Sequence, residues 1–131
     1  MSPQPRVPVV AVGVTRRVAV SVGATVFADT PYDMVAVLDW TESPKELQYS
    51  PANLAVVLNA LQPRPRALIA GNAVPEELMP ELSAVWDEYA RRHEIEGAFV
   101  GLSRIVGWQP GPPPQEVSDE LMRKLKEIFG V

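Results

Sequence analysis

The sequence contains no cysteine and only one histidine. Without cysteine the chain cannot form a disulfide, use a catalytic thiolate or bind a metal ion through sulfur. A single histidine and the lack of a tight carboxylate cluster also leave it without the usual ligand set for zinc or calcium. We therefore expect no metal site.

Positive charge and long hydrophobic runs are scarce as well. The chain has 12 Lys and Arg against 16 Asp and Glu, a net charge of −4, whereas nucleic-acid binding depends on clustered Lys and Arg. The apolar run near the N-terminus covers only residues 7–14 and is interrupted by Pro8, which is too short for a signal peptide or a membrane span. We expect a soluble, cytoplasmic protein that binds neither nucleic acid nor membrane.

Glycine-rich phosphate-binding loops are missing too. The turn after the first apolar run contains Gly13, but Thr15 and Val18 occupy the next two glycine positions of the dinucleotide fingerprint. No Walker-type phosphate loop occurs anywhere in the chain. A phosphoacceptor receiver domain would need acidic residues where this chain has Thr15, Arg16 and Asn72. We therefore expect no cofactor and find no motif for phosphotransfer.

Four short apolar runs are present, and each reads as a buried strand. None alternates cleanly between polar and apolar residues, which is typical of parallel strands that are covered on both faces. The fourth run contains two glycines and has the weakest strand preference. The four predicted strands cover residues 8–14, 34–40, 67–71 and 97–103.

Helical spacing separates these strands. Residues 50–62 predict a helix with Ser50 as N-cap and Pro51 at its first position. Residues 75–94 predict a longer helix whose first turn is loosened by Pro80 and whose apolar face includes a buried Trp86.

Two further segments are predicted to be helical. Residues 118–130 predict a helix capped by Ser118, with an apolar stripe of Leu121, Leu125, Ile128 and Phe129 and a terminal glycine. Residues 15–28 are rich in β-branched side chains. We expect a short helix there, and a strand remains the alternative.

The alternation of strands and helices predicts a parallel sheet with right-handed crossovers. We expect one α/β domain over residues 1–131, a small doubly wound sandwich of the Rossmann-like or flavodoxin-like type. It should have three layers, about four parallel strands in the order 2-1-3-4, and a proline-rich surface connection at 107–115. So small a sheet would leave an open edge or an incomplete cover, and a homodimer would close it.

Ligands of open parallel sheets bind beyond the carboxyl ends of the strands, near the point where the strand order reverses. This rule selects candidate ligand-binding residues without any motif, and Arg16 or Arg104 would hold an anionic ligand. The candidates are Thr15, Arg16, Asp39, Trp40, Asn72, Ser103 and Arg104.

Three positions carry opposing interpretations. Asp39 is either a cap of the following turn or the acid of a ligand pocket, and we favour the cap. Gly71 and Asn72 tolerate positive φ, so they can reverse the chain without holding a ligand. His93 closes a helix, where the dipole favours its cationic form, and a structural role is favoured over catalysis.

These observations favour a non-catalytic module that binds a small ligand or a partner protein. An alternative is a small enzyme that acts on an anionic metabolite through Asp39, Thr15 and Ser103. A further alternative is a degenerate nucleotide-binding domain that keeps the fold without the cofactor.

Overall fold

The computed structural model describes residues 7–13, 20, 23–24, 27–39, 43–71, 74, 76–101 and 115–130 of the chain, with side chains from residue 119 onward in the last of these segments. The strands are β1 (Val7–Val12), β2 (Tyr32–Leu38), β3 (Ala67–Ala70) and β4 (Ala98–Gly101). The helices are α2 (Pro51–Ala60), α3 (Met79–His93) and α4 (Gln115–Phe129), with short 3₁₀ turns η2 (Lys45–Leu47) and η3 (Glu76–Leu78).

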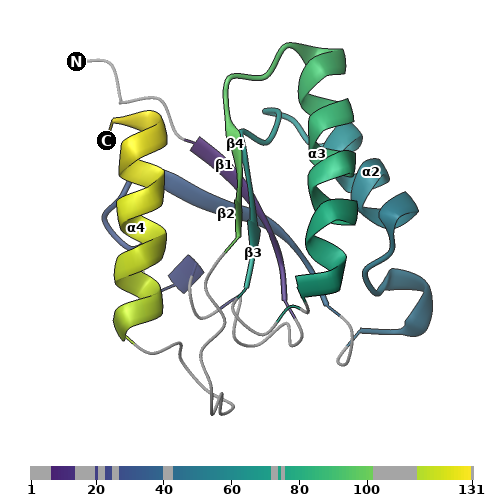
Figure 1. Cartoon of the computed structure of the whole chain (residues 1–131), viewed down its shortest axis with the longest axis horizontal. Coiled ribbons are helices and arrows are strands. Elements are labelled where there is room, and N and C mark those ends of the chain that lie inside the picture. Colours follow the sequence, from purple (N-terminus) through teal and green to yellow (C-terminus); the bar gives the residue numbers. More distant parts are fainter. Residues whose placement is uncertain are drawn as a thin grey trace.

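The four strands form one parallel sheet in the order β2-β1-β3-β4. Helices α2 and α3 cover one face of this sheet, and α4 covers the other, so the fold has three layers (Figure 1). The predicted doubly wound α/β fold and its strand order are therefore confirmed. The order reverses between β1 and β3, because the chain moves outward to β2 on one side and to β4 on the other.

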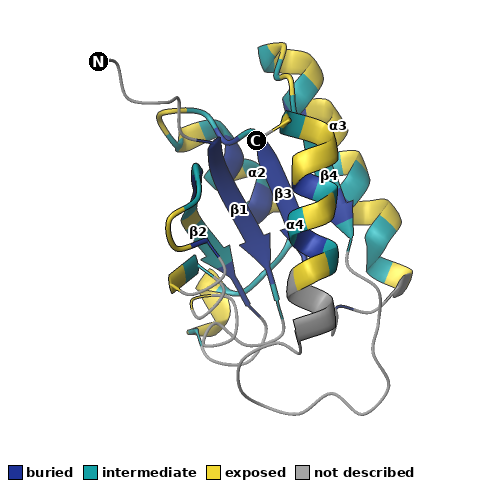
Figure 2. Cartoon of the chain, turned by 90° about the vertical axis from the view of Figure 1, so that its left-hand side faces the viewer, coloured by how far each residue is buried: buried dark blue, intermediate teal, exposed yellow. Residues whose placement is uncertain are grey.

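The two central strands are buried on both faces, which explains their continuous apolar sequences. Every residue of β1 and of β3 is buried, and Figure 2 shows both strands in the colour of buried residues. Alternate residues of β1 serve opposite faces: Val7 and Val9 pack in the α4 layer, while Val10 and Val12 pack under α2 and α3. A strand covered on both faces needs apolar residues at every position.

A β-bulge in the edge strand β2 changes which face its side chains serve. The pairing with β1 skips Val35. Tyr32 and Met34 consequently pack in the α4 layer, while Ala36 and Leu38 pack under α2 and α3. Without the inserted residue, all four side chains would point to the same face.

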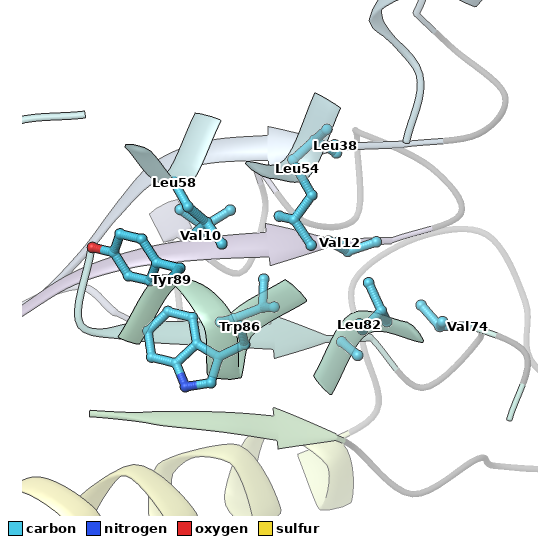
Figure 3. Close-up of a cluster of buried hydrophobic side chains, with 11 residues drawn as sticks. Val10, Val12, Leu38, Leu54, Leu58, Val74, Leu82, Trp86 and Tyr89 are labelled. Carbon is cyan, nitrogen blue, oxygen red and sulfur yellow. The ribbon is translucent and has the colours of Figure 1, made fainter. Parts of the chain in front are cut away.

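Three of the predicted helices, those at 50–62, 75–94 and 118–130, are present as α2, α3 and α4, and their apolar stripes pack on the sheet. In α2, Ser50 Oγ accepts a hydrogen bond from the amide of Asn53 at 3.0 Å, and Pro51 follows the cap. Figure 3 shows Leu54 and Leu58 of α2 and Trp86 of α3 packed against the sheet. The η3 turn before α3 is the loose first turn expected around Pro80, because proline cannot donate the hydrogen bonds of a regular helix.

Two details of the last helix differ from the prediction. α4 begins at Gln115, so Ser118 lies inside it and is not its N-cap. The Gln115-Glu116 pair consists of good helix formers, and the proline run that limits the helix ends at residue 114. The apolar stripe holds at Leu121 and Leu125, but Ile128 is 41% exposed.

The segment predicted as a helix at 15–28 lies mostly outside the described residues. The chain leaves it in a turn, where the amide and the hydroxyl of Thr30 both donate to the carbonyl of Phe27, at 3.1 and 2.7 Å. The proline-rich connection also lies outside the described residues, except for Gln115. Within the described part of the chain, no helix is both long and apolar enough to cross a membrane.

Candidate functional site

The candidate site is the edge of the sheet formed by the carboxyl ends of the strands. Of the seven residues predicted there, the structure describes Asp39 alone. The others are Thr15, Arg16, Trp40, Asn72, Ser103 and Arg104, which lie outside the described residues. The geometry of the site therefore comes from the strand ends and from the elements beside them.

Two glycines lie next to each other where the strand order reverses. β1 ends before Gly13, whose amide donates to the carbonyl of Leu38 at 3.0 Å. β3 ends before Gly71, whose amide donates to the carbonyl of Val12 at 2.9 Å. The switch point is therefore bordered by two residues without side chains, which leaves the backbone open to approach.

The conformation of Gly71 differs from the one expected. We predicted a reversal through positive φ, but the described residues with positive φ are Asp29, Glu94 and Gly130. Gly71 starts an ordinary hydrogen-bonded turn, in which the amide of Val74 donates to its carbonyl at 3.1 Å. Without a positive φ, the backbone at Gly71 does not by itself require glycine.

Packing does not require glycine at position 71 either. A Cβ atom built there would lie 3.6 Å from the carbonyl oxygen of Val12 and 3.9 Å from the Cα of Gly13. Both are ordinary contact distances. The described structure would accept alanine at this position, so neither backbone strain nor packing explains the glycine.

Asp39 lies at the carboxyl end of β2 and is fully buried. Its Oδ2 accepts a hydrogen bond from the amide of Ser43 at 2.9 Å, and its carbonyl accepts one from the amide of Tyr49 at 2.7 Å. The first contact is the one that a turn cap makes. The carboxylate thus organises the connection from β2 to α2, and its role toward a ligand stays a prediction.

The connection from β2 to α2 is held by side chains that the sequence did not single out. Asn53 Nδ2 donates to the carbonyls of Glu46 and Gln48, at 2.9 and 2.8 Å. The hydroxyl of Tyr49 donates to Glu81 Oε1 at 2.8 Å and so joins this connection to the start of α3. Burial raises the pKa of Tyr49, and the neighbouring Glu81 carboxylate raises it further.

One cation reaches the same edge from the opposite layer. Lys124 of α4 donates through Nζ to the carbonyl oxygen of Gly101, the last residue of β4, at 2.9 Å. No local pattern could have placed it there, because the contact depends on how α4 packs against the sheet. The ammonium group brings positive charge to the end of β4.

His93 lies at the other end of the molecule, as expected from its place at the end of α3. Its Nε2 lies 2.6 Å from Asn59 Oδ1, and its ring is 5.3 Å from the ring of Tyr89. Burial lowers the pKa of His93, and the charges of Arg64 and Arg92 lower it further. These effects oppose the cationic form, which the helix dipole was expected to favour.

Two cavities lined by described residues can be placed relative to the strand ends. The larger one reaches Val37, next to the end of β2, and neither includes the described ends of β1 and β3 in its lining. One of about 530 Å³ runs beside β2 and is lined by residues that include Phe27, Asp29 and Met34. The other, of about 250 Å³, is a groove between α2 and α3. Neither is lined by Asp39 or Gly71. Among the described side chains, no group of three or more acids or histidines is placed to hold a metal ion.

Comparisons with protein families, with curated proteins and with solved structures find no match for this chain.

Proposed function

We propose that this protein is a non-catalytic module that binds a small ligand at the switch point between β1 and β3. The observation that carries the proposal is the pair Gly13 and Gly71, side by side at the strand ends. Since the described residues place no demand for glycine at position 71, a ligand that approaches the backbone there is the physical reason we assign to it.

The chemistry around this position favours an anionic ligand. Lys124 brings positive charge to the end of β4. In the sequence, Arg16 follows the end of β1 by four residues and Arg104 follows the end of β4 by three. Thr15, Asn72 and Ser103 follow strand ends in the same way and would donate hydrogen bonds to anionic oxygens. Trp40 would add an apolar surface for the rest of the ligand.

The proposal is non-catalytic because of the position of Asp39. The carboxylate is fully buried and accepts a hydrogen bond from Ser43, whereas a general acid or base must reach the substrate. The alternative enzyme would use Asp39 together with Thr15 and Ser103. It predicts turnover of the bound compound, which a pure binding module lacks.

The experiment is a thermal-shift screen against nucleotides, dinucleotides, sugar phosphates and common metabolites, with the wild type and Gly71→Ala in parallel. A ligand at about 100 times its dissociation constant stabilises the folded state by about 2.7 kcal/mol. We expect a hit among the anionic compounds, with binding at least tenfold weaker in Gly71→Ala because the new methyl group occupies the backbone surface.

Gly71→Ala also provides its own control. The substitution should leave the free energy of unfolding unchanged or raise it by about 0.4–1 kcal/mol, because the backbone conformation suits alanine. Equal affinity in both proteins would contradict a site at the switch point. If NMR shows that the protein converts the bound compound chemically, the enzyme is favoured. If the compound that binds is a dinucleotide, the degenerate nucleotide-binding domain is favoured.

We further propose that the protein forms a homodimer. The support is the outer face of α2, which carries no charged residue and exposes 65% of Val56. Apolar surface of this kind is characteristic of a protein contact.

A further inference from the structure

The outer surface of α2 differs from those of the other two helices. α2 has the sequence PANLAVVLNA, without a single charged residue, whereas α3 and α4 carry acids and bases along their length. Leu54 and Leu58 turn inward, and the opposite side of the helix consists of the exposed residues Ala52, Val56 and Ala60. A helix that is apolar all round is normally covered on all sides.

The two asparagines of α2 do not make this outer side polar. Asn53 donates to the backbone carbonyls of Glu46 and Gln48, and Asn59 donates to the carbonyl of Ala55 and contacts His93. The side-chain NH₂ groups of both asparagines thus donate to carbonyls within the chain.

A further exposed apolar residue lies near the first turn of the helix. Asn53 holds the η2 turn against the first part of α2, and Leu47 of η2 is 66% exposed. We call the exposed line of Ala52, Val56 and Ala60, spaced four residues apart along α2, the ridge of this surface.

A groove borders the ridge. It lies between α2 and α3, has a volume of about 250 Å³, and includes Ala55, Val85 and Tyr89 in its lining. The charges at this groove are Glu88 and Arg92, which form an ion pair at 3.6 Å. The ridge and the groove are therefore neighbours on one surface that has no net charge.

The sheet edges are poor alternatives for self-association. β4 has only four residues, and β2 carries the bulge at Val35, which twists the strand and interrupts a regular ladder. Short edge strands and bulges are the devices by which sheets avoid pairing with another chain. The surface that the fold leaves open for a partner is therefore the outer side of α2, and not a sheet edge.

From this geometry we infer that α2 and the groove beside it bind a second copy of the same chain, an inference that rests on the homodimer proposed above. A two-fold axis beside Val56 would place the ridge of each copy in the groove of the other. The contacts across such an axis are reciprocal, so each copy offers the same two surfaces to its partner. Ridges packing into grooves is the general mode of helix contact.

Charge and area both favour a second copy as the partner. The chain as a whole carries a net charge of −4, so two copies repel each other through most surfaces, and the neutral α2 surface avoids this repulsion. A stable interface buries about 800 Å² per partner, roughly a tenth of the 7601 Å² that the chain exposes. A ten-residue helix is only about 15 Å long, so the contact needs the groove and the flank of α3 as well as the ridge.

The test compares two substitutions that each place one acid at an exposed apolar residue of a helix. Val56→Glu changes the ridge, and Ile128→Glu changes α4 on the opposite face of the sheet. We expect sedimentation equilibrium to show a dimer for the wild type and for Ile128→Glu. The dissociation constant of Val56→Glu should be at least tenfold higher, with an unchanged circular dichroism spectrum.

Each outcome is decisive. A Val56→Glu protein that dimerises like the wild type would overturn the assignment to α2, while the homodimer itself would stand. Loss of the dimer in Ile128→Glu alone would move the interface to α4. A wild type that stays monomeric at its highest soluble concentration would overturn both the interface and the homodimer, and would leave the ligand site at the switch point untouched.

Discussion

At the scale of single residues, the structure requires glycine at one end of β4 and not at the other. Gly97 precedes β4, and a Cβ atom built there would overlap the carbonyl oxygen of Arg66, which also accepts the amide of Ala98 at 3.2 Å. Gly101 ends the same strand, and a Cβ there would meet Met79 Sδ at an ordinary 3.6 Å. Neither glycine has a positive φ, so only the close approach at Gly97 requires glycine.

This difference predicts the outcome of two alanine substitutions. Gly97→Ala should lower the free energy of unfolding by about 1–3 kcal/mol, because the β3 and β4 backbones must separate to admit the methyl group. Gly101→Ala is the matched control and should change it by less than about 1 kcal/mol. Urea denaturation monitored by circular dichroism measures the free energy of unfolding of both variants. Equal losses in the two variants would show that the close approach of Arg66 is not the reason for glycine at position 97.

At the scale of elements, local sequence signals placed the ends of α2 correctly. Ser50 caps the helix through a hydrogen bond at 3.0 Å, Pro51 follows, and the helix ends before the Gln62–Pro65 segment. These signals act over three or four residues, so they are visible in the sequence. The start of α4 was misplaced because Ser118 resembles a cap, although Gln115 and Glu116 extend the helix by one turn.

The cap of α2 can be tested by removing one oxygen atom. Ser50→Ala should lower the free energy of unfolding by about 1 kcal/mol, because the amide of Asn53 loses its partner. Ser50→Asp keeps an acceptor at the same position and should retain most of the stability. Thermal denaturation of the three proteins makes the comparison, and a loss in Ser50→Asp equal to that in Ser50→Ala would show that the cap contributes little.

At the scale of the whole molecule, α2 and α3 are joined at the amino ends of the strands by His93 and Asn59. Burial lowers the pKa of His93 below its ordinary value, and Arg64 and Arg92 act in the same direction. The unfolded chain therefore binds a proton more readily than the folded one. The contribution of His93 to stability is present above pH 6.5 and is lost as the pH falls below it.

Because the chain has one histidine, this dependence can be isolated. The free energy of unfolding should decrease between about pH 7.5 and 5.5, a range above the ordinary pKa values of carboxylates. His93→Gln keeps a hydrogen-bonding side chain and should flatten the curve in this window. Urea denaturation at several pH values gives the slopes, and an unchanged slope in His93→Gln would assign the effect to other groups.

Local signals in the sequence, namely periodicity, caps and prolines, were enough to predict the strands, their parallel arrangement and the layers. It also led to Asp39, because strand ends can be read along the chain. Three other features became visible only in the folded chain: Gly13 and Gly71 lie side by side, Lys124 reaches the end of β4, and the bulge at Val35 redirects β2. These features join residues far apart in the chain, and local propensity carries no information about such contacts. The exposure of the uncharged α2 face could not be predicted either. The sequence of an apolar helix is the same whether the fold covers one side of it or all sides.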